Sequence, residues 1–208
     1  MRLKPSAILL VGPTGAGKTP LGEWLHAHGL WGRTVRHFDF GEQLRTIVAA
    51  EEPPPFLTPD ECAYLDQVLN DGALLENEHF PIAKKILNAF ICRGLPDKNT
   101  LIALNGLPRH VGQAEDVATL VEIRTVIALS CCEATAAERL RTNAGGDRTA
   151  RTDDDADAVS RKLKIYAERT APLLDYYRTR GIRILTVPVT PSTSPKDIVD
   201  QLKDAPSC

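Results

Sequence analysis

The residues most suited to chemistry form a glycine-rich string close to the start of the sequence. The pattern G-x-x-x-x-G-K-[ST] of a phosphate-binding loop is matched by Gly12-Pro13-Thr14-Gly15-Ala16-Gly17-Lys18-Thr19. Glycines let backbone N–H groups converge on a phosphate, and the N-terminus of the next helix adds positive potential. In such a loop Lys18 reaches the β- and γ-phosphates and the Thr19 hydroxyl binds Mg²⁺. The string therefore predicts an ATP site, whereas the alternative is a glycine-rich turn with an exposed lysine.

This loop needs a strand before it and a helix after it, and the sequence predicts both. Residues 7–11 are a continuous apolar run of strand length, and residues 18–28 have apolar residues at helical spacing before Gly29. Thr58, Pro59 and Glu61 form a capping box that predicts another helix start. Further strands are predicted at 34–38, 100–104, 122–130 and 182–187, and further helices at 42–50, 58–70, 78–92, 134–141, 156–180 and from 194 onward. Strands that alternate with helices predict a doubly wound α/β sheet.

Composition limits the class of protein. The 208 residues fit one domain, and 43% hydrophobic with 25% charged residues is ordinary for a soluble globular chain. A disordered or collagenous chain is excluded. The formal net charge of −2 argues against a nucleic-acid binder that depends on bulk positive charge.

The cysteines and the N-terminal residues bear on the compartment. The five cysteines include no CxxC pair, and adjacent Cys131 and Cys132 lack the spacing of zinc ligands. Free thiols in a reducing compartment are the simple interpretation. The apolar run at 7–11 is too short for a signal peptide or a membrane span, so a cytoplasmic protein without membrane contact is expected.

Four more segments match motifs in the order of one enzyme family. They are Phe40-Gly41-Glu42-Gln43-Leu44-Arg45, similar to S-T-G-D-x-L-R; Asn105-Gly106-Leu107-Pro108-Arg109 with Gln113, similar to D-G-F-P-R-x-x-x-Q; Arg151-Thr152-Asp153-Asp154, similar to R-x-D-D; and Thr170 to Tyr177, similar to T-A-P-L-x-x-Y-Y. Together with the phosphate loop they cover nearly the whole chain. The sequence thus resembles the adenylate kinase and nucleoside monophosphate kinase family.

The resemblance implies an α/β fold of the P-loop NTPase type, with three layers around a five-stranded parallel sheet. The single kinase domain would have a core of residues 1–40, 81–141 and 154–208. A helical insert at 41–80 would close over the acceptor monophosphate, and a short lid at 142–153, without zinc cysteines, would close over ATP. A monomer is expected.

The resemblance also implies roles for individual residues. Arg45 and Arg109 would hold the acceptor phosphate, and Gln113 would hydrogen-bond the acceptor base. Charge during transfer would be stabilised by Lys18, Arg109, Arg151 and Lys162. The other expected contacts are Phe40, Gly41, Ala73, Leu74, Leu75 and Gly106 at the acceptor; Arg139, Val189, Thr190 and Pro191 at the ATP base; and Thr19 with Glu42 and Asn105, through water, at Mg²⁺.

Four residues depart from the family pattern. Asn105 replaces an aspartate, and because an amide has no charge, metal affinity should fall unless Glu42 compensates. Lys162 replaces an arginine and loses the bidentate fork. Asn143 stands where a lid arginine is expected, and Phe40 replaces a small hydroxyl residue near the acceptor base.

The function expected from these residues is Mg²⁺-dependent transfer of the γ-phosphoryl group of ATP to a nucleoside monophosphate, with AMP as the first acceptor. The phosphoryl-transfer step itself needs positive charge and alignment more than covalent chemistry, and arginines supply both. Two alternatives stay open. One is a nucleotide-binding module of the same fold with weak or no turnover, and the other is a P-loop kinase for a small molecule that is not a nucleotide.

Overall fold

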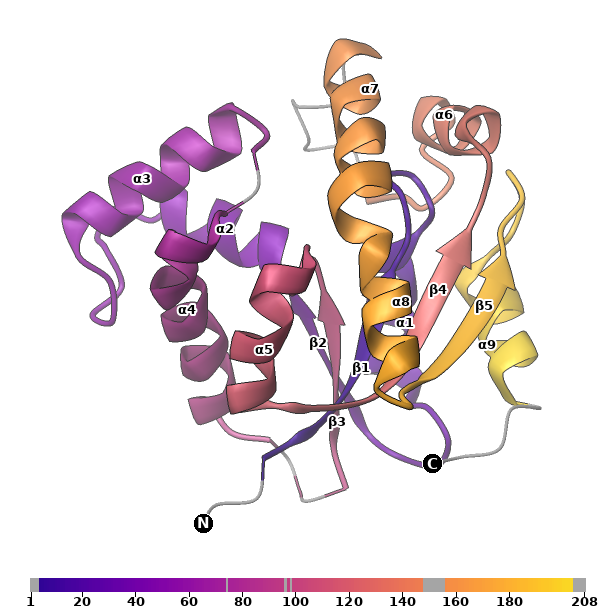
Figure 1. Cartoon of the computed structure of the whole chain (residues 1–208), viewed down its shortest axis with the longest axis horizontal. Helices are drawn as coiled ribbons and strands as arrows, with labels where there is room; N and C mark the ends of the chain where they lie inside the picture. Colours follow the sequence, from indigo (N-terminus) through magenta and orange to yellow (C-terminus); the bar gives the residue numbers. More distant parts are fainter. Residues whose placement is uncertain (1–3, 74, 96, 98, 148–155, 204–208) are drawn as a thin grey trace.

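The computed structural model describes residues 4–73, 75–95, 97, 99–147 and 156–203. Its centre is a five-stranded sheet in which every pair of neighbouring strands is parallel, in the order β2-β3-β1-β4-β5 (Figure 1). The strands are β1 Ser6–Val11, β2 Val35–Asp39, β3 Leu101–Asn105, β4 Glu122–Ser130 and β5 Arg183–Pro188. This confirms the α/β fold with five parallel strands.

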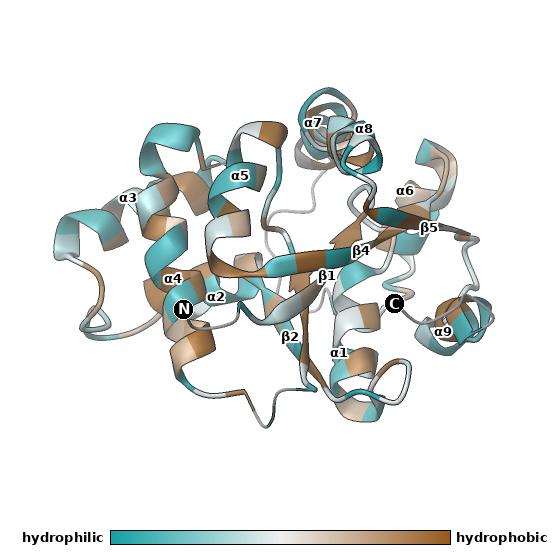
Figure 2. Ribbon diagram, turned by 60° about the horizontal axis from the view of Figure 1, so that its bottom comes forward, coloured by the Kyte–Doolittle hydropathy of each residue, from teal (hydrophilic) through white to brown (hydrophobic). Residues whose placement is uncertain are grey.

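Helices cover both faces of the sheet. Helix α1 (Lys18–His28) and helix α9 (Pro195–Lys203) pack on one face, whereas α4 (Phe80–Cys92), α5 (Val111–Leu120) and α8 (Pro172–Thr179) pack on the other. Side chains of β1 alternate between the two cores, with Leu9 among the second group of helices and Ile8 and Leu10 on the α1 side. Figure 2 shows hydrophobic colouring concentrated in the sheet between these layers.

The remaining elements lie around the carboxyl ends of the strands. Helix α2 (Phe40–Val48) continues directly from β2 and packs against α3 (Pro59–Asn70), and a 3₁₀ turn η1 (Asn77–His79) leads into α4 (Figure 1). Helix α6 (Glu133–Arg141) follows β4, and α7 (Ala156–Ile165) continues into a π-helical segment η2 (Tyr166–Thr170). Among the described residues, no helix combines the length and the apolar character needed to cross a membrane.

Two helix predictions need correction. The sequence analysis missed α5, because the buried Gln113 interrupts the apolar pattern of this short helix. The single helix expected over 156–180 is divided, because Pro172 has no N–H to donate to the preceding turn. The helical turn before Pro172 is wider than an α-helical turn. In it, the Ala171 N–H donates to the carbonyl of Tyr166, five residues earlier, at 2.8 Å.

The residues around Thr58 predicted the start of α3 correctly. The Thr58 hydroxyl accepts a hydrogen bond from the Glu61 N–H at 3.2 Å, and the Glu61 carboxylate accepts one from the Thr58 N–H at 2.8 Å. This is the predicted capping box, and Pro59 is the first residue of α3. Bonds to Lys85 and Thr58 hold the pKa of Glu61 below its usual value.

Candidate active site

The glycine-rich loop joins the end of β1 to the start of α1 at the carboxyl edge of the sheet. Gly15 and Gly17 have φ angles of 82° and 94°, in the left-handed region that favours glycine. A Cβ on Gly15 would also lie only 2.7 Å from the Ala136 carbonyl oxygen. The Lys18 ammonium donates hydrogen bonds to the carbonyls of Gly12 at 2.7 Å and Pro13 at 2.8 Å. The loop therefore curls around its own lysine, with the N-terminus of α1 behind it.

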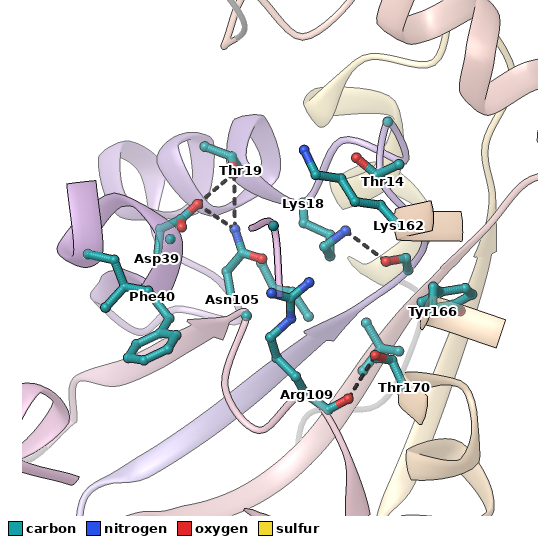
Figure 3. Close-up of a pocket in the computed structure, with 18 of the residues that line it drawn as sticks. Thr14, Lys18, Thr19, Asp39, Phe40, Asn105, Arg109, Lys162, Tyr166 and Thr170 are labelled. Carbon is teal, nitrogen blue, oxygen red and sulfur yellow. Dashed lines mark hydrogen bonds between the residues drawn. The ribbon is translucent and has the colours of Figure 1, made fainter. Parts of the chain in front are cut away.

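A hydrogen-bonded cluster of three side chains lies next to the loop (Figure 3). The Thr19 hydroxyl donates to Asp39 Oδ2 at 2.6 Å, and Asn105 Nδ2 donates to the same oxygen at 2.7 Å and to Thr19 Oγ1 at 3.0 Å. Asp39 and Asn105 end neighbouring strands and face each other in register. Parallel strands place their carboxyl ends at one edge, which is where ligands bind in α/β sheets.

Asp39 is a site residue that the sequence analysis did not name. Its side chain is only 5% exposed, and its second oxygen, Oδ1, accepts the Glu42 backbone N–H at 3.0 Å as the N-cap of α2. The available signal was an acidic residue directly after the strand predicted at 34–38 and three residues before the helix predicted from residue 42. The Glu42 side chain, which was expected near the metal, is exposed and does not line the cavity.

Arg109 enters the same region from the turn after β3. Its backbone is anchored twice, because its N–H donates to Gln113 Oε1 at 2.9 Å and its carbonyl accepts the Thr170 hydroxyl at 2.7 Å. The side chain extends from there toward Asn105 and Lys18 (Figure 3). Burial lowers the pKa of the guanidinium, and nearby Asp39 offsets part of this shift.

One cavity connects the loop, the strand ends and the insert. Its lining includes most of the residues expected at both substrates: Gly12, Thr14, Gly15, Gly17, Lys18, Thr19, Phe40, Gly41, Arg45, Ala73, Leu75, Asn105, Gly106, Arg109, Gln113, Arg139 and Lys162. The lining also includes residues that were not expected: Asp39, Leu44, Val68, Leu69, Asp147, Tyr166 and Thr170. The predicted residues Leu74 and Arg151 lie outside the described residues, as does much of the predicted lid.

Apolar side chains of α2 and α3 line one end of this cavity. Phe40, Leu44, Val68 and Leu69 contribute apolar surface. Gln113, expected to contact the acceptor base, is 1% exposed, and its Nε2 donates to the Leu75 carbonyl at 2.7 Å. Both ends of its amide therefore bond to backbone groups, which ties the insert to α5.

Arg139 holds the opposite end of the cavity together. It is 5% exposed, and its guanidinium donates to the carbonyls of Gly15 at 3.0 Å, Thr190 at 2.8 Å, Pro191 at 3.2 Å and Thr193 at 2.9 Å. These bonds join the phosphate loop to the segment after β5, where Val189, Thr190 and Pro191 were expected to form a wall of the base site. The structure places Thr190 and Pro191 beside Arg139, but none of the three predicted residues lines the cavity described above.

The backbone conformation after α6 accounts for an asparagine at position 143, where the family pattern has an arginine. Asn143 follows α6 with a φ of 47°, a left-handed conformation that asparagine tolerates better than arginine. Its N–H donates to the Leu140 carbonyl at 3.1 Å, and the Ala144 N–H donates to the Arg139 carbonyl at 3.0 Å. This pair of bonds is a Schellman motif, so the residue type suits the end of the helix.

The site can hold a magnesium nucleotide by the chemistry of its donors. Mg²⁺ prefers oxygen ligands from one or two side chains together with phosphate oxygens and water. The Thr19 hydroxyl and the Asp39 carboxylate offer such oxygens next to the phosphate loop, 2.6 Å from each other. Lys18, Arg109 and Lys162 surround the same region with positive charge.

Comparison with known proteins adds a family relationship. The chain is 32% identical over 180 residues to an adenylate kinase of Prochlorococcus marinus (strain MIT 9313), which covers 84% of this chain and 86% of the relative. It is 32% identical over 184 residues to an adenylate kinase of Synechococcus sp. (strain WH7803), covering 85% and 87%. For an adenylate kinase of Parvibaculum lavamentivorans the identity is 30% over 187 residues, covering 84% and 80%. No family model matches the chain.

Proposed function

Because the chain belongs to the adenylate kinase and nucleoside monophosphate kinase family, we propose that it transfers the γ-phosphoryl group of ATP to AMP. Family membership by itself supports a more general function, that of an ATP-dependent phosphotransferase of the nucleoside monophosphate kinase type. The choice of AMP and the competence for turnover belong to the proposal.

The observation that supports this function is one continuous cavity with two differently built ends. The phosphate loop and Lys18 lie at one end, the apolar acceptor pocket lies at the other, and Arg45 and Arg109 line the cavity with them. Phosphoryl transfer requires that donor and acceptor phosphates approach in line among positive charges. Arginines suit this task because the planar guanidinium binds two phosphate oxygens at once.

Each residue has a physical task in the proposed reaction. Backbone N–H groups of residues 12–19 hold the ATP phosphates, and the Lys18 ammonium exchanges its two carbonyl partners for phosphate oxygens. Arg45 and Arg109 fix the acceptor phosphate, while Lys162 neutralises charge from the side of α7. When bound, Mg²⁺ orients the β- and γ-phosphates and withdraws charge from the bond that breaks.

Closure of the insert at 41–80 and of the lid at 142–153 would complete the site. Closure excludes water, which would otherwise compete with the acceptor for the phosphoryl group. Arg151 would enter with the lid. At the other end, the guanidinium of Arg139 is held in place by its carbonyl partners and would pack against the ATP base.

The proposed preference for AMP rests on the acceptor pocket and on the relatives. Phe40 and Leu44 suit the flat face of a purine, and both line the cavity together with Gly106. The relatives found are named adenylate kinases. Asn105 and Lys162 are the departures that the proposed activity must tolerate.

The test is phosphoryl transfer from MgATP to each nucleoside monophosphate in turn, with diphosphate products separated by chromatography. We expect turnover with AMP above the other acceptors, and a loss of at least about a hundredfold in kcat for Lys18→Ala. The matched control is Lys84→Ala, an exposed lysine on α4 that does not line the cavity. Protein that binds ATP without turnover on any monophosphate would contradict the proposal.

A further inference from the structure

This site differs from the family pattern in which of two neighbouring strands carries a carboxylate at its end. The family has an aspartate at the end of the third strand, where this chain has Asn105, and the carboxylate here is Asp39 on the neighbouring strand in register. We propose that Asp39 supplies the carboxylate of the Mg²⁺–ATP site and that Asn105 is the neutral residue that positions it. This inference rests on the proposed function and assigns its metal-binding charge.

Asp39 lies close to the expected metal ligand. Asp39 Oδ2 is 2.6 Å from Thr19 Oγ1, the hydroxyl that binds the metal in a phosphate loop of this kind. A cation next to Thr19 therefore meets Asp39 directly or through one water molecule. Both side chains line the cavity that holds the phosphate loop.

Burying the charge of Asp39 has a cost. Asp39 is 5% exposed, and the groups that donate hydrogen bonds to it include the Thr19 hydroxyl, the Asn105 amide and the Glu42 N–H. A buried carboxylate is stable only when hydrogen bonds and opposite charge offset its lost hydration. Arg109 contributes positive charge nearby, and a divalent cation contributes more.

The contact between the two strand ends explains why residue 105 is an asparagine. Asn105 Nδ2 is 2.7 Å from Asp39 Oδ2, so an aspartate at position 105 would bring two carboxylates into contact. Two carboxylates at such a distance do not both ionise, and one of them would hold a proton. An amide instead donates a hydrogen bond and keeps the full charge on Asp39. The asparagine is thus the expected partner of an aspartate on β2.

The capping role of Asp39 does not account for its charge. Only Oδ1 accepts the Glu42 N–H, and asparagine caps helices as well as aspartate does. Asp39→Asn therefore removes the charge and keeps the cap. The double variant Asp39→Asn/Asn105→Asp restores one carboxylate and one amide in contact, with the charge moved to β3.

The test measures how strongly Mg²⁺ improves nucleotide binding, without requiring turnover. A fluorescent ATP analogue is titrated in excess Mg²⁺ and in EDTA, and Mn²⁺ binding to the protein–ATP complex is followed by electron paramagnetic resonance. We expect Asp39→Asn to lose about tenfold to a hundredfold of the metal-dependent gain in affinity. The double variant should recover most of that gain. The matched control is Asp116→Asn, an exposed carboxylate on α5 outside the cavity, which should equal the unmodified protein.

Three results would overturn the proposal. The first is an undiminished metal-dependent gain in Asp39→Asn, and the second is a folded double variant that binds the metal no better than Asp39→Asn. The third is a loss of the gain in Glu42→Gln with none in Asp39→Asn, which would assign the charge to Glu42. If Asp39→Asn does not fold by circular dichroism, the double variant, which keeps the hydrogen bond, decides alone. Failure of phosphoryl transfer to every monophosphate would refute the proposed function while leaving this binding measurement interpretable.

Discussion

At the scale of single residues, the site depends on polar side chains that are buried and fully used. Arg139 is the clearest case, because its guanidinium bonds to the carbonyls of four residues in two separate segments. Gln113 likewise joins Arg109 to Leu75. Buried groups of this kind cost more when a partner is removed than they contribute as a pair. They set the shape of the cavity before any ligand is bound.

Replacing Arg139 should therefore release both segments. We expect Arg139→Met to lower the free energy of unfolding by about 3 kcal/mol, because the carbonyls lose a charged donor. Arg141→Met, two residues along α6, removes an exposed ion pair with Glu138 and should leave the free energy of unfolding unchanged within error. Urea denaturation of both variants measures the difference. Equal midpoints for the two variants would refute the assigned role of Arg139.

At the scale of elements, packing of α1 on β2 overrides local preference. Gly22 lies inside α1, where glycine is unfavourable by about 1 kcal/mol relative to alanine. A Cβ at this position would lie 2.2 Å from Nε2 of His37 on β2. Glycine at position 22 therefore leaves room for the His37 ring at the expense of helix propensity.

This contact predicts that a helix-favouring substitution is harmful. Gly22→Ala should lower the free energy of unfolding by about 1–2 kcal/mol, since overpacking outweighs the propensity gain. In a His37→Ala background, the same change should be neutral or stabilising, because the ring is absent. A double-mutant cycle in urea tests this coupling. Additive effects of the two substitutions would show that the ring and the glycine do not compete for space.

His37 also makes stability depend on pH. Its Nε2 has no hydrogen-bond partner within the part of the chain that the structure describes, and burial lowers its pKa against the smaller raising effect of Asp39. Below pH 6.5, the usual pKa of histidine, the imidazole of residue 37 binds a proton in the unfolded chain more readily than in the folded chain. The free energy of unfolding should thus fall as the pH decreases from 7 to 5.

The variant His37→Asn should make this fall shallower. His110 is shifted in the same direction, so part of the slope should remain. Glu61 and Glu76 contribute mainly below their usual value of 4.5, outside this window. Urea denaturation at pH 5, 6 and 7 measures the slope, and an unchanged slope in the variant would exclude His37 as its source.

At the scale of the whole molecule, the insert shares the hydrophobic core on one face of the sheet through buried side chains such as Leu44, Leu65 and Val68, and polar contacts add to this packing. Glu76, just before η1, pairs with Arg169 of η2 at 2.9 Å, and both side chains are about half exposed. Exposed pairs of this kind contribute little stability. Gln113 adds its hydrogen bond to the Leu75 carbonyl. Ligands that bind only the folded chain add to its stability whatever the strength of these contacts.

Nucleotides should raise the melting temperature in a way that separates their two sites. Ligand at a hundred times its Kd adds about 2.7 kcal/mol, or roughly 5–10 °C for a chain of this size. MgATP should shift the unmodified protein but not Lys18→Ala, whereas AMP should shift both. Differential scanning fluorimetry measures these shifts. An AMP shift that disappears in Lys18→Ala would mean that AMP occupies the phosphate loop and not the acceptor pocket.

Features that depend on a few neighbouring residues could be predicted from the sequence. The phosphate loop, the capping box at Thr58 and the five strands follow from spacing, turn chemistry and apolar runs, all of which act within about ten residues. The parallel sheet follows from the alternation of strands and helices. The family relationship indicated by five ordered motifs was confirmed by relatives with about 30% identity. The roles of the individual site residues remain predictions.

The partners of the buried side chains were decided only by the tertiary structure. Asp39 meets Thr19 across 20 residues and Asn105 across 66, and Arg139 meets Gly15 across 124. No local pattern specifies such pairs, because strand order and helix packing bring together residues that are distant along the chain. The helix over 111–120 was missed for the same reason, since Gln113 is buried by a bond to Leu75, 38 residues away. Sequence thus determined which groups the site contains. Packing determined which of them form hydrogen bonds with each other and which line the same cavity.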